Sequence, residues 1–217
     1  DLWYGTNNGI SLQDSKTGKW RSFLSTFENV QNSKNHIFTT LCEVSPGIIW
    51  AGGYFSGLYQ IDKRTSKTTY FTPASYAHES IRPDKYIRDI RKDSRGYVWS
   101  GGYYNLKRIN VQTKDIRLYH GLHSVTAIIE KDDKSMWIGT ATGLFLLDIE
   151  SGKYERIQLP VESTYVYSLY QTKQGSLYIG TSGSGVLIYD PQTKLFTHYY
   201  TGNCAMISNN IYTILSD

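Results

Sequence analysis

The strongest constraint in this sequence of 217 residues is a pattern that recurs five times. Each copy has three short apolar runs separated by turns, and residues 135–158, SMWIGTATGLFLLDIESGKYERIQ, show the pattern most clearly. Runs of about five residues that are rich in aromatic and branched side chains, and bounded by Gly, Asp or Ser, indicate β-strands. Because the agreement is internal to one chain, it predicts one structural unit repeated along the sequence.

The copies agree at particular positions. Each has an aromatic anchor: Trp3, Trp50, Trp99, Trp137 and Tyr178. Two residues after each anchor stands a glycine: Gly5, Gly52, Gly101, Gly139 and Gly180. A second glycine follows in four copies, and Asn105 replaces it in the third. Five residues later comes an acid or amide: Asp14, Asp62, Asn110, Asp148 and Asp190. A hydroxyl residue follows three positions on: Thr17, Thr65, Thr113, Ser151 and Thr193.

The spacing of the repeat predicts the fold class. Successive anchors are 38 to 49 residues apart, and a less regular apolar run precedes each anchor strand from the second copy on. We name the four strands of a unit A, B (with the anchor), C and D. A period near 40 built from four short strands predicts an all-β fold, a β-propeller of four-stranded antiparallel blades.

Residues 1–217 are expected to form one propeller region with about five blades. The sequence begins within a blade, at the strand of Trp3, and residues 207–217 are expected to be the first strand of a following blade. We therefore interpret the chain as a sector of a larger propeller. A closed ring of five blades, with the last strand beside the first, is the alternative.

Turn chemistry and packing explain the shared positions without catalysis. Asp and Asn side chains accept hydrogen bonds from backbone amides two or three residues on, so the acids after strand C are expected to form turns. The anchor Trp is expected to be buried between blades. Glycine two residues later lets the neighbouring sheet approach closely.

Composition excludes several function classes. The net charge is +4 with no basic block, which argues against nucleic-acid binding. No apolar run is long enough to span a bilayer. Cys42 and Cys204 define no disulfide or metal framework. His120 and His123 lack further ligands at a suitable spacing. We predict no metal, no cofactor and no catalytic residues.

One face of the predicted propeller carries a candidate ligand site. The D–A loops vary in length, and they lie with the B–C turns on one face, where insertions often mark binding. Aromatic and polar residues gather there in the second and third blades. The candidate ligand-binding residues are Tyr54, Phe55, Arg82, Tyr86, Tyr103, Tyr104 and Asn105. The alternative is that these tyrosines only pack beneath the loops.

The runs LWYGTNNGI, MWIGTATGLFLLD and LYIGTSGSGVLIYD resemble the two-component regulator propeller repeat. Departures are scattered singly: Tyr178 for Trp, Asn105 for Gly, and Lys134 at the A–B turn. The resemblance implies seven-bladed propellers, often two in tandem, in the periplasmic sensor region of hybrid two-component histidine kinases. It also implies an immunoglobulin-like domain, a membrane helix and a kinase elsewhere in such a protein, and oligosaccharide ligands.

Three functions follow as hypotheses. The first is a non-enzymatic segment that senses oligosaccharides released from complex polysaccharides. The second is a structural scaffold, without its own ligand site, that transmits a signal or forms a homodimer. The third is a propeller lyase or glycosidase, for which strand A offers few acids: Glu43, Asp89 and Glu130.

Overall fold

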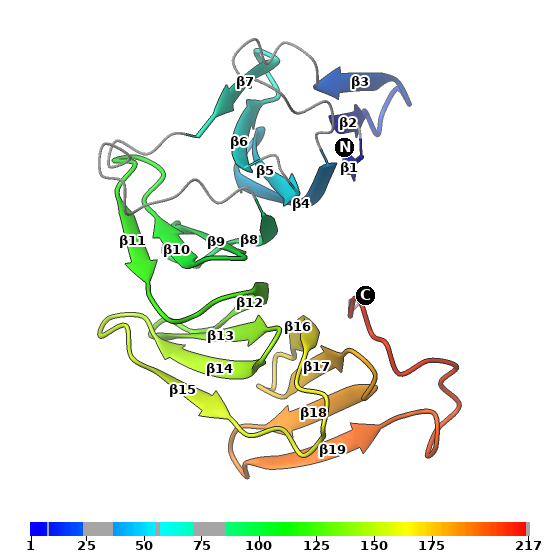
Figure 1. Ribbon diagram of the computed structural model, residues 1–217. Helices are drawn as coiled ribbons and strands as arrows, with labels where there is room; N and C mark the ends of the chain where they lie inside the picture. Colours follow the sequence, from blue (N-terminus) through cyan, green and yellow to red (C-terminus); the bar gives the residue numbers. More distant parts are fainter. Residues whose placement is uncertain (8, 24–36, 55–56, 72–85, 216–217) are drawn as a thin grey trace. The chain divides into compact units, whose positions relative to one another are not determined.

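The computed structural model describes residues 1–7, 9–23, 37–54, 57–71 and 86–215. Its strands form five antiparallel sheets, which confirms the predicted all-β class. In every sheet the strands lie side by side in chain order, as in a propeller blade (Figure 1). No helix among these residues is long and apolar enough to cross a membrane.

The sheets correspond to the five copies of the repeat. Blade one has three strands, β1 (Leu2–Thr6), β2 (Gly9–Gln13) and β3 (Trp20–Phe23). Blade two has β4 (Ile37–Ser45), β5 (Ile48–Tyr54), β6 (Gly57–Asp62) and β7 (Lys67–Tyr70). Blade three has β8 (Ile87–Lys92), β9 (Val98–Gly102), β10 (Leu106–Ile109) and β11 (Ile116–Tyr119). Blade four has β12 (Val125–Asp132), β13 (Ser135–Thr140), β14 (Gly143–Asp148) and β15 (Tyr154–Ile157). Blade five has β16 (Val166–Gln171), β17 (Leu177–Thr181), β18 (Val186–Asp190) and β19 (Leu195–Tyr199).

The chain divides into two compact units, Asp1–Leu118 and Tyr119–Asp217. In the first unit, one apolar cluster joins blades one and two and another joins blades two and three. In the second unit, one cluster joins blades four and five. The cores therefore lie between sheets, because a blade buries its two faces only against its neighbours.

The anchors Trp50, Trp99 and Trp137 are buried as predicted, whereas Trp3 and Tyr178 are only partly buried. Trp50 and Trp99 are fully buried, and Trp137 is 1% exposed. The Trp137 ring makes an edge-to-face contact with Tyr189 of blade five, with ring centroids 5.9 Å apart. Its Nε1 donates a hydrogen bond of 3.0 Å to Oε1 of Gln171, also in blade five. Trp137 thus joins two blades through both apolar and polar contacts.

Gly52 and Gly139, which follow the anchors Trp50 and Trp137, lie where the next blade comes very close. A Cβ on Gly52 would stand 2.6 Å from Cγ2 of Ile87, and one on Gly139 would stand 2.7 Å from Cγ1 of Val166. Real Cβ atoms essentially never approach so closely, so only glycine fits without a shift. The expected close approach is confirmed at these positions, and the requirement is space rather than backbone conformation.

A β-bulge recurs at one place in strand A of blades two to five. The register with strand B shifts between Phe38 and Thr40 in blade two, and at the corresponding residues in the other three blades. A bulge re-aims the side chain of its extra residue. Thr39 donates from Oγ1 to the Ile87 carbonyl of blade three at 3.4 Å. Thr126 does the same to the Val166 carbonyl of blade five at 2.5 Å.

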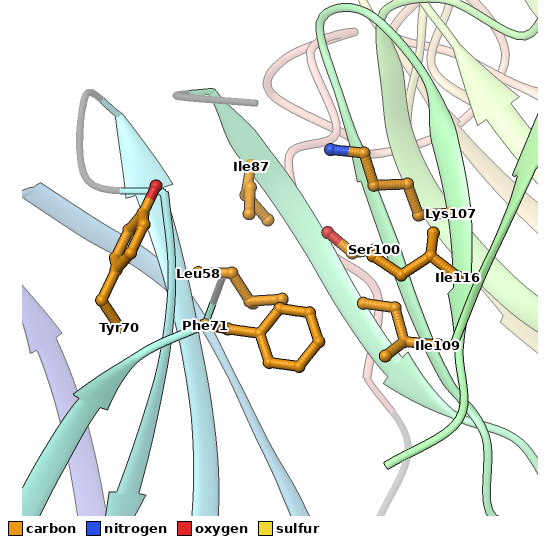
Figure 2. A pocket seen from close by; sticks show the side chains of 8 residues that line it. All are labelled: Leu58, Tyr70, Phe71, Ile87, Ser100, Lys107, Ile109 and Ile116. Atoms are coloured by element: carbon orange, nitrogen blue, oxygen red, sulfur yellow. The ribbon is translucent and has the colours of Figure 1, made fainter. Parts of the chain in front are cut away.

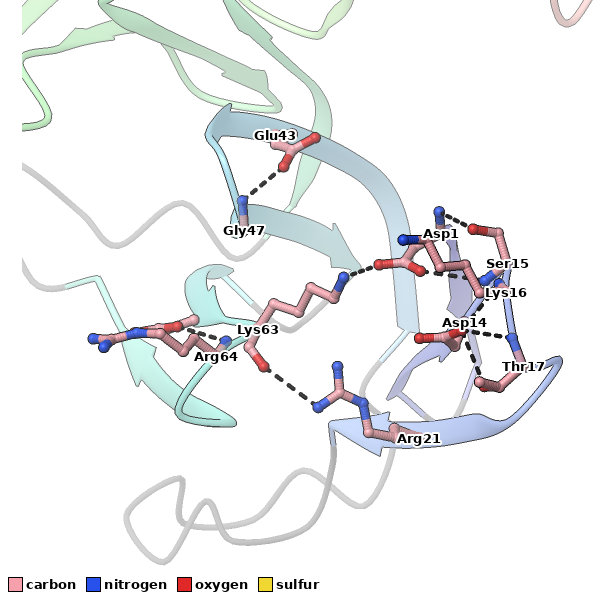
Figure 3. A network of polar contacts seen from close by, with 11 residues as sticks. Asp1, Asp14, Ser15, Lys16, Thr17, Arg21, Glu43, Gly47, Lys63 and Arg64 are labelled. Atoms are coloured by element: carbon pink, nitrogen blue, oxygen red, sulfur yellow. Dashed lines mark hydrogen bonds and ion pairs between the residues drawn. The ribbon is translucent and has the colours of Figure 1, made fainter.

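The C–D turns confirm the turn role of the acids that recur in the repeat. Oδ1 of Asp14 accepts hydrogen bonds from the amides of Lys16 and Thr17 at 3.0 and 2.8 Å (Figure 3). Asp62, Asn110 and Asp190 accept the same two hydrogen bonds in blades two, three and five, and Asp148 of blade four accepts one from the amide of Ser151. These residues form turns. Nearby, Lys63 of blade two forms an ion pair with Asp1.

The segment after β19 differs from expectation. Residues 207–215 form no strand, although a first strand of a following blade was predicted over 207–217. Ile211 nevertheless occupies the place that Ile87 and Val166 take in their blades. Its carbonyl oxygen would lie 2.6 Å from a Cβ on Gly180, and its amide donates to the Thr181 carbonyl at 2.9 Å. A β-strand requires a ladder of paired residues, and no such ladder joins this segment to another strand among the described residues. Its assignment to a following blade stays a prediction.

Replacing Trp137 by Ala should lower the free energy of unfolding by about 3–5 kcal/mol, because it empties a packed inter-blade core. Chemical denaturation of the chain measures this loss. The control is Trp20→Ala, since Trp20 is 58% exposed. It should cost less than about 1 kcal/mol. Equal effects of the two substitutions would contradict the role of the anchor.

Gly139→Ala should lower the free energy of unfolding by about 1–3 kcal/mol, because the new methyl group collides with Val166. Shortening the partner should relieve the collision. In the double variant Gly139→Ala/Val166→Ala, the loss of unfolding free energy should be smaller than the sum of the two single losses by at least about 0.5 kcal/mol. Additive losses would show that the two blades do not meet at this glycine.

Acid should destabilise the fold through the C–D turns. Hydrogen bonds from turn amides lower the pKa of Asp14, Asp62 and Asp190 below the usual 3.8. A lowered pKa in the folded state contributes stability above the unfolded pKa, and this is lost as pH falls through the folded value. The Tm should therefore fall as the pH drops below about 4.

The control for this pH dependence is Asp62→Asn/Asp190→Asn. The amide keeps an acceptor oxygen but does not titrate, as Asn110 shows in blade three. The double variant should have a flatter Tm profile below about pH 4. An unchanged slope would assign the acid sensitivity to other groups.

Candidate functional site

Four of the predicted site residues come together in the first unit. We call Tyr54, Tyr86, Tyr103 and Tyr104 the tyrosine row. The ring centroids of Tyr54 and Tyr86 are 6.2 Å apart, those of Tyr86 and Tyr103 are also 6.2 Å apart, and those of Tyr103 and Tyr104 are 5.0 Å apart. Tyr103 is 54% exposed and Tyr104 is 38% exposed, so the row ends at the surface.

Backbone contacts hold the row in place. Tyr54 ends β5 of blade two and pairs with Tyr86, just before β8 of blade three, through an isolated antiparallel bridge. The amide of Tyr103 donates to the Tyr86 carbonyl at 3.1 Å. Tyr86 therefore links the end of one blade to the B–C turn of the next. The order of the rings follows from strand pairing, which the sequence alone does not show.

The structure adds one residue that the sequence reasoning missed. The guanidinium carbon of Arg88 lies 5.9 Å from the centroid of the Tyr54 ring, within reach of a cation–π contact. Arg88 is the bulge residue of blade three, in the register shift between Ile87 and Asp89. An alignment of the A strands that allowed for the extra bulge residue would have placed Arg88 at the position of Thr39.

Of the other predicted site residues, the structure describes Asn105 but not Phe55 and Arg82. Asn105 is half-buried between the B–C turn and β10, and its backbone does not adopt the positive φ that favours glycine. The second glycines have positive φ in the other blades, for example 73° at Gly57, whereas Asn105 does not. The two bulky tyrosines therefore accompany a turn of different shape. Phe55 and Arg82 lie outside the described residues.

An enclosed cavity lies between blades two and three, and it is not a ligand site. Eight residues line it (Figure 2), among them the buried Lys107 and Ser100, whose polar ends face the space between the two sheets. Its volume is about 10 Å³, which is about the space that one water molecule requires. The open tyrosine row is therefore the better candidate for an organic ligand.

Two of the three strand-A acids, Glu43 and Asp89, are engaged in local structure. Glu43 accepts a hydrogen bond of 2.8 Å from the amide of Gly47, which closes the A–B turn. Asp89 is 7% exposed and lies 3.2 Å from Nε of Arg91. Among the residues that the structure describes, no group of three or more His, Cys, Asp or Glu side chains could hold a metal ion.

Comparison with known proteins identifies the repeat. Residues 160–183 match the family model described as "Two component regulator propeller". The match covers the connection from blade four and strands β16 and β17 of blade five. This confirms the repeat type that the sequence resembles. No curated protein sequence matches the chain.

Solved structures share the fold over nearly the whole chain. The extracellular domain of BT4673 from B. thetaiotaomicron, described as a hybrid two component system, is 21% identical with a TM-score of 0.77 over 99% of this chain and 28% of that chain. The extracellular domain of BT3049 from the same organism, described likewise, is 17% identical with a TM-score of 0.73 over 90% and 28%. Virginiamycin B lyase from Staphylococcus aureus is 14% identical with a TM-score of 0.71 over 91% and 65%.

These likenesses confirm the β-propeller fold, with five sheets that correspond to part of a larger protein. This chain spans about 28% of the length of both B. thetaiotaomicron chains. At this level of identity the comparison establishes fold and not activity. Because sensor regions and a lyase share the fold, only the chemistry of the site separates these functions.

Proposed function

We propose that this chain is a ligand-sensing propeller segment in the extracytoplasmic, periplasmic part of a hybrid two-component sensor. We propose further that the tyrosine row binds an oligosaccharide released from a complex polysaccharide. The observation that carries this proposal is the contiguous row of four tyrosine rings beside the Arg88 guanidinium. A neighbouring propeller and an immunoglobulin-like domain of the same protein are proposed to complete the site.

The chemistry of the row suits sugars. A sugar ring presents an apolar face to an aromatic plane and hydroxyl groups to polar side chains. Tyrosine supplies both kinds of contact, and it loses little conformational entropy because it has few rotatable bonds. Arg88 adds hydrogen-bond donors next to Tyr54.

The same chemistry argues against an enzyme. Lyases and glycosidases need positioned acid and base groups near the bound sugar. In this chain Glu43 is bonded to a turn amide and Asp89 is paired with Arg91. We therefore propose that the segment binds its ligand without chemical change. Any kinase activity belongs to another part of the protein.

The second candidate function is a scaffold that transmits a signal or forms a homodimer. It is favoured by exposed apolar side chains on blades one and five. Leu2, Trp20 and Leu195 are 56%, 58% and 69% exposed. Such side chains mark surfaces that contact other protein. A neighbouring propeller region of the same protein explains them equally well.

Replacing Tyr103 and Tyr104 together by Ala in the full-length protein should abolish the transcriptional response to an active oligosaccharide. Removing two rings takes away the exposed half of the row, while the buried core is untouched. The measurement is induction of the target operon, with expression of the protein checked in parallel.

The matched control is Tyr199→Ala/Tyr200→Ala. Tyr199 and Tyr200 are also adjacent, are 42% and 38% exposed, and lie in the other unit. This variant should respond like the wild type. A normal response of Tyr103→Ala/Tyr104→Ala, at normal expression, would place the site elsewhere and favour the scaffold function.

A further inference from the structure

A groove lies at the end of blades two and three that is opposite the tyrosine row. The A–B and C–D turns of an antiparallel blade meet at one end, whereas the tyrosine row belongs to the B–C end. The groove has a volume of about 480 Å³. This falls within the range of pockets that bind small molecules. Its walls come from Val44 and Ser45 of blade two and from both turns of blade three.

The groove carries an excess of positive charge. Lys92 and Arg95 line it, and both side chains are exposed. Neither forms an ion pair with any residue that the structure describes. Charged side chains without a partner are free to bind a ligand of opposite charge.

The acid of the same turn cannot neutralise this charge. The side chain of Asp93 is fully buried, 3.5 Å from Nε of Arg108. Its oxygens accept hydrogen bonds from the amides of Arg95 and Tyr97 and from Nε1 of Trp99, at 3.1, 2.9 and 2.9 Å. Asp93 is therefore satisfied inside the blade and turned away from solvent. The groove surface keeps its two cations.

An aromatic ring stands beside these cations. Tyr97 lines the groove, and the guanidinium carbon of Arg108 lies 3.6 Å from its ring centroid. Because Arg108 is buried and held by Asp93, its contact fixes the orientation of the Tyr97 ring. A rigid ring offers a contact surface at low entropic cost.

Amides of the C–D turn complete the set of polar groups. Asn110 uses its Oδ1 for the amides of Gln112 and Thr113, which leaves its amide nitrogen as a donor. The exposed side chain of Gln112 lines the same groove. The groove therefore combines two cations, amide groups and one oriented ring.

We infer that this groove binds an acidic sugar, a hexuronate unit of an oligosaccharide. Its carboxylate pairs with Lys92 and Arg95, its ring lies against Tyr97, and its hydroxyls bond to the amides of Asn110 and Gln112. A carboxylate alone would use the cations but neither the ring nor the amides, which is why a sugar acid fits better than a simple anion. This site does not depend on the tyrosine row.

The test is calorimetric titration of the full-length protein with tri-galacturonate. The Tyr103→Ala/Tyr104→Ala background removes the tyrosine row, so failure of the proposed function and failure of this inference are distinguishable. Binding should persist in that background. Adding Lys92→Glu/Arg95→Glu should weaken it at least tenfold, and Tyr97→Leu should weaken it severalfold. Raised salt should also weaken binding, because exposed charges are screened.

Matched controls separate the groove from general charge effects. Lys134→Glu/Lys173→Glu makes the same charge change in the A–B turns of blades four and five, where both lysines are exposed. This variant should bind tri-galacturonate like the background protein. Lys92→Gln/Arg95→Gln is a milder change, because it removes both positive charges without introducing negative ones. This variant should also lose most of the affinity.

Two further ligands test the chemical class. Galactotriose has the same sugar rings without carboxylates, and tri-glutamate has carboxylates without sugar rings. Both should bind at least tenfold more weakly than tri-galacturonate. The inference is overturned if tri-galacturonate does not bind, or if Lys92→Glu/Arg95→Glu binds as well as its control. It is also overturned if tri-glutamate binds as tightly as the sugar acid, because the groove would then recognise acidic peptides.

Discussion

The close contact between neighbouring blades at the glycine after the anchor, seen at Gly52 and Gly139, is the constraint on which the rest of each unit depends. At Gly52 and Gly139 the next blade comes so near that a single methyl group would collide with Ile87 or Val166. This approach lets the anchor tryptophans fill most of the space between sheets. Stability in each unit is therefore a property of blade pairs, as expected for a repeat protein.

Variation is concentrated where it does not disturb this contact. Blade three keeps its anchor and its turn residue Asn110, but it replaces the second glycine by Asn105 and carries two tyrosines in the B–C turn. Its bulge residue is Arg88, where Thr39 and Thr126 bond to the next blade. The proposed surface site thus lies at positions that the shared core leaves open to variation.

The two ends of blades two and three have different chemistry. The B–C end presents tyrosine rings that contact one another, and the turn end presents a basic groove around an oriented Tyr97. Both sites span the contact between the same two blades, which the buried cluster around Trp50 and Ile87 holds firmly. A ligand bound at either end would affect the contact between these two blades. In the proposed sensor, this is one way to transmit ligand binding to the rest of the protein.

The sequence by itself determined the blades, the anchors, the turn acids and the tyrosines of the B–C turns. These are local features, set by strand periodicity and by side chains that bond to their own backbone. Only the tertiary structure decided that Arg88 lies beside Tyr54, that Arg108 covers Tyr97, and that Ile211 contacts blade five without forming a strand. Each of these depends on strand register or on a neighbouring blade, because a one-residue bulge redirects a side chain without any clear mark in the sequence.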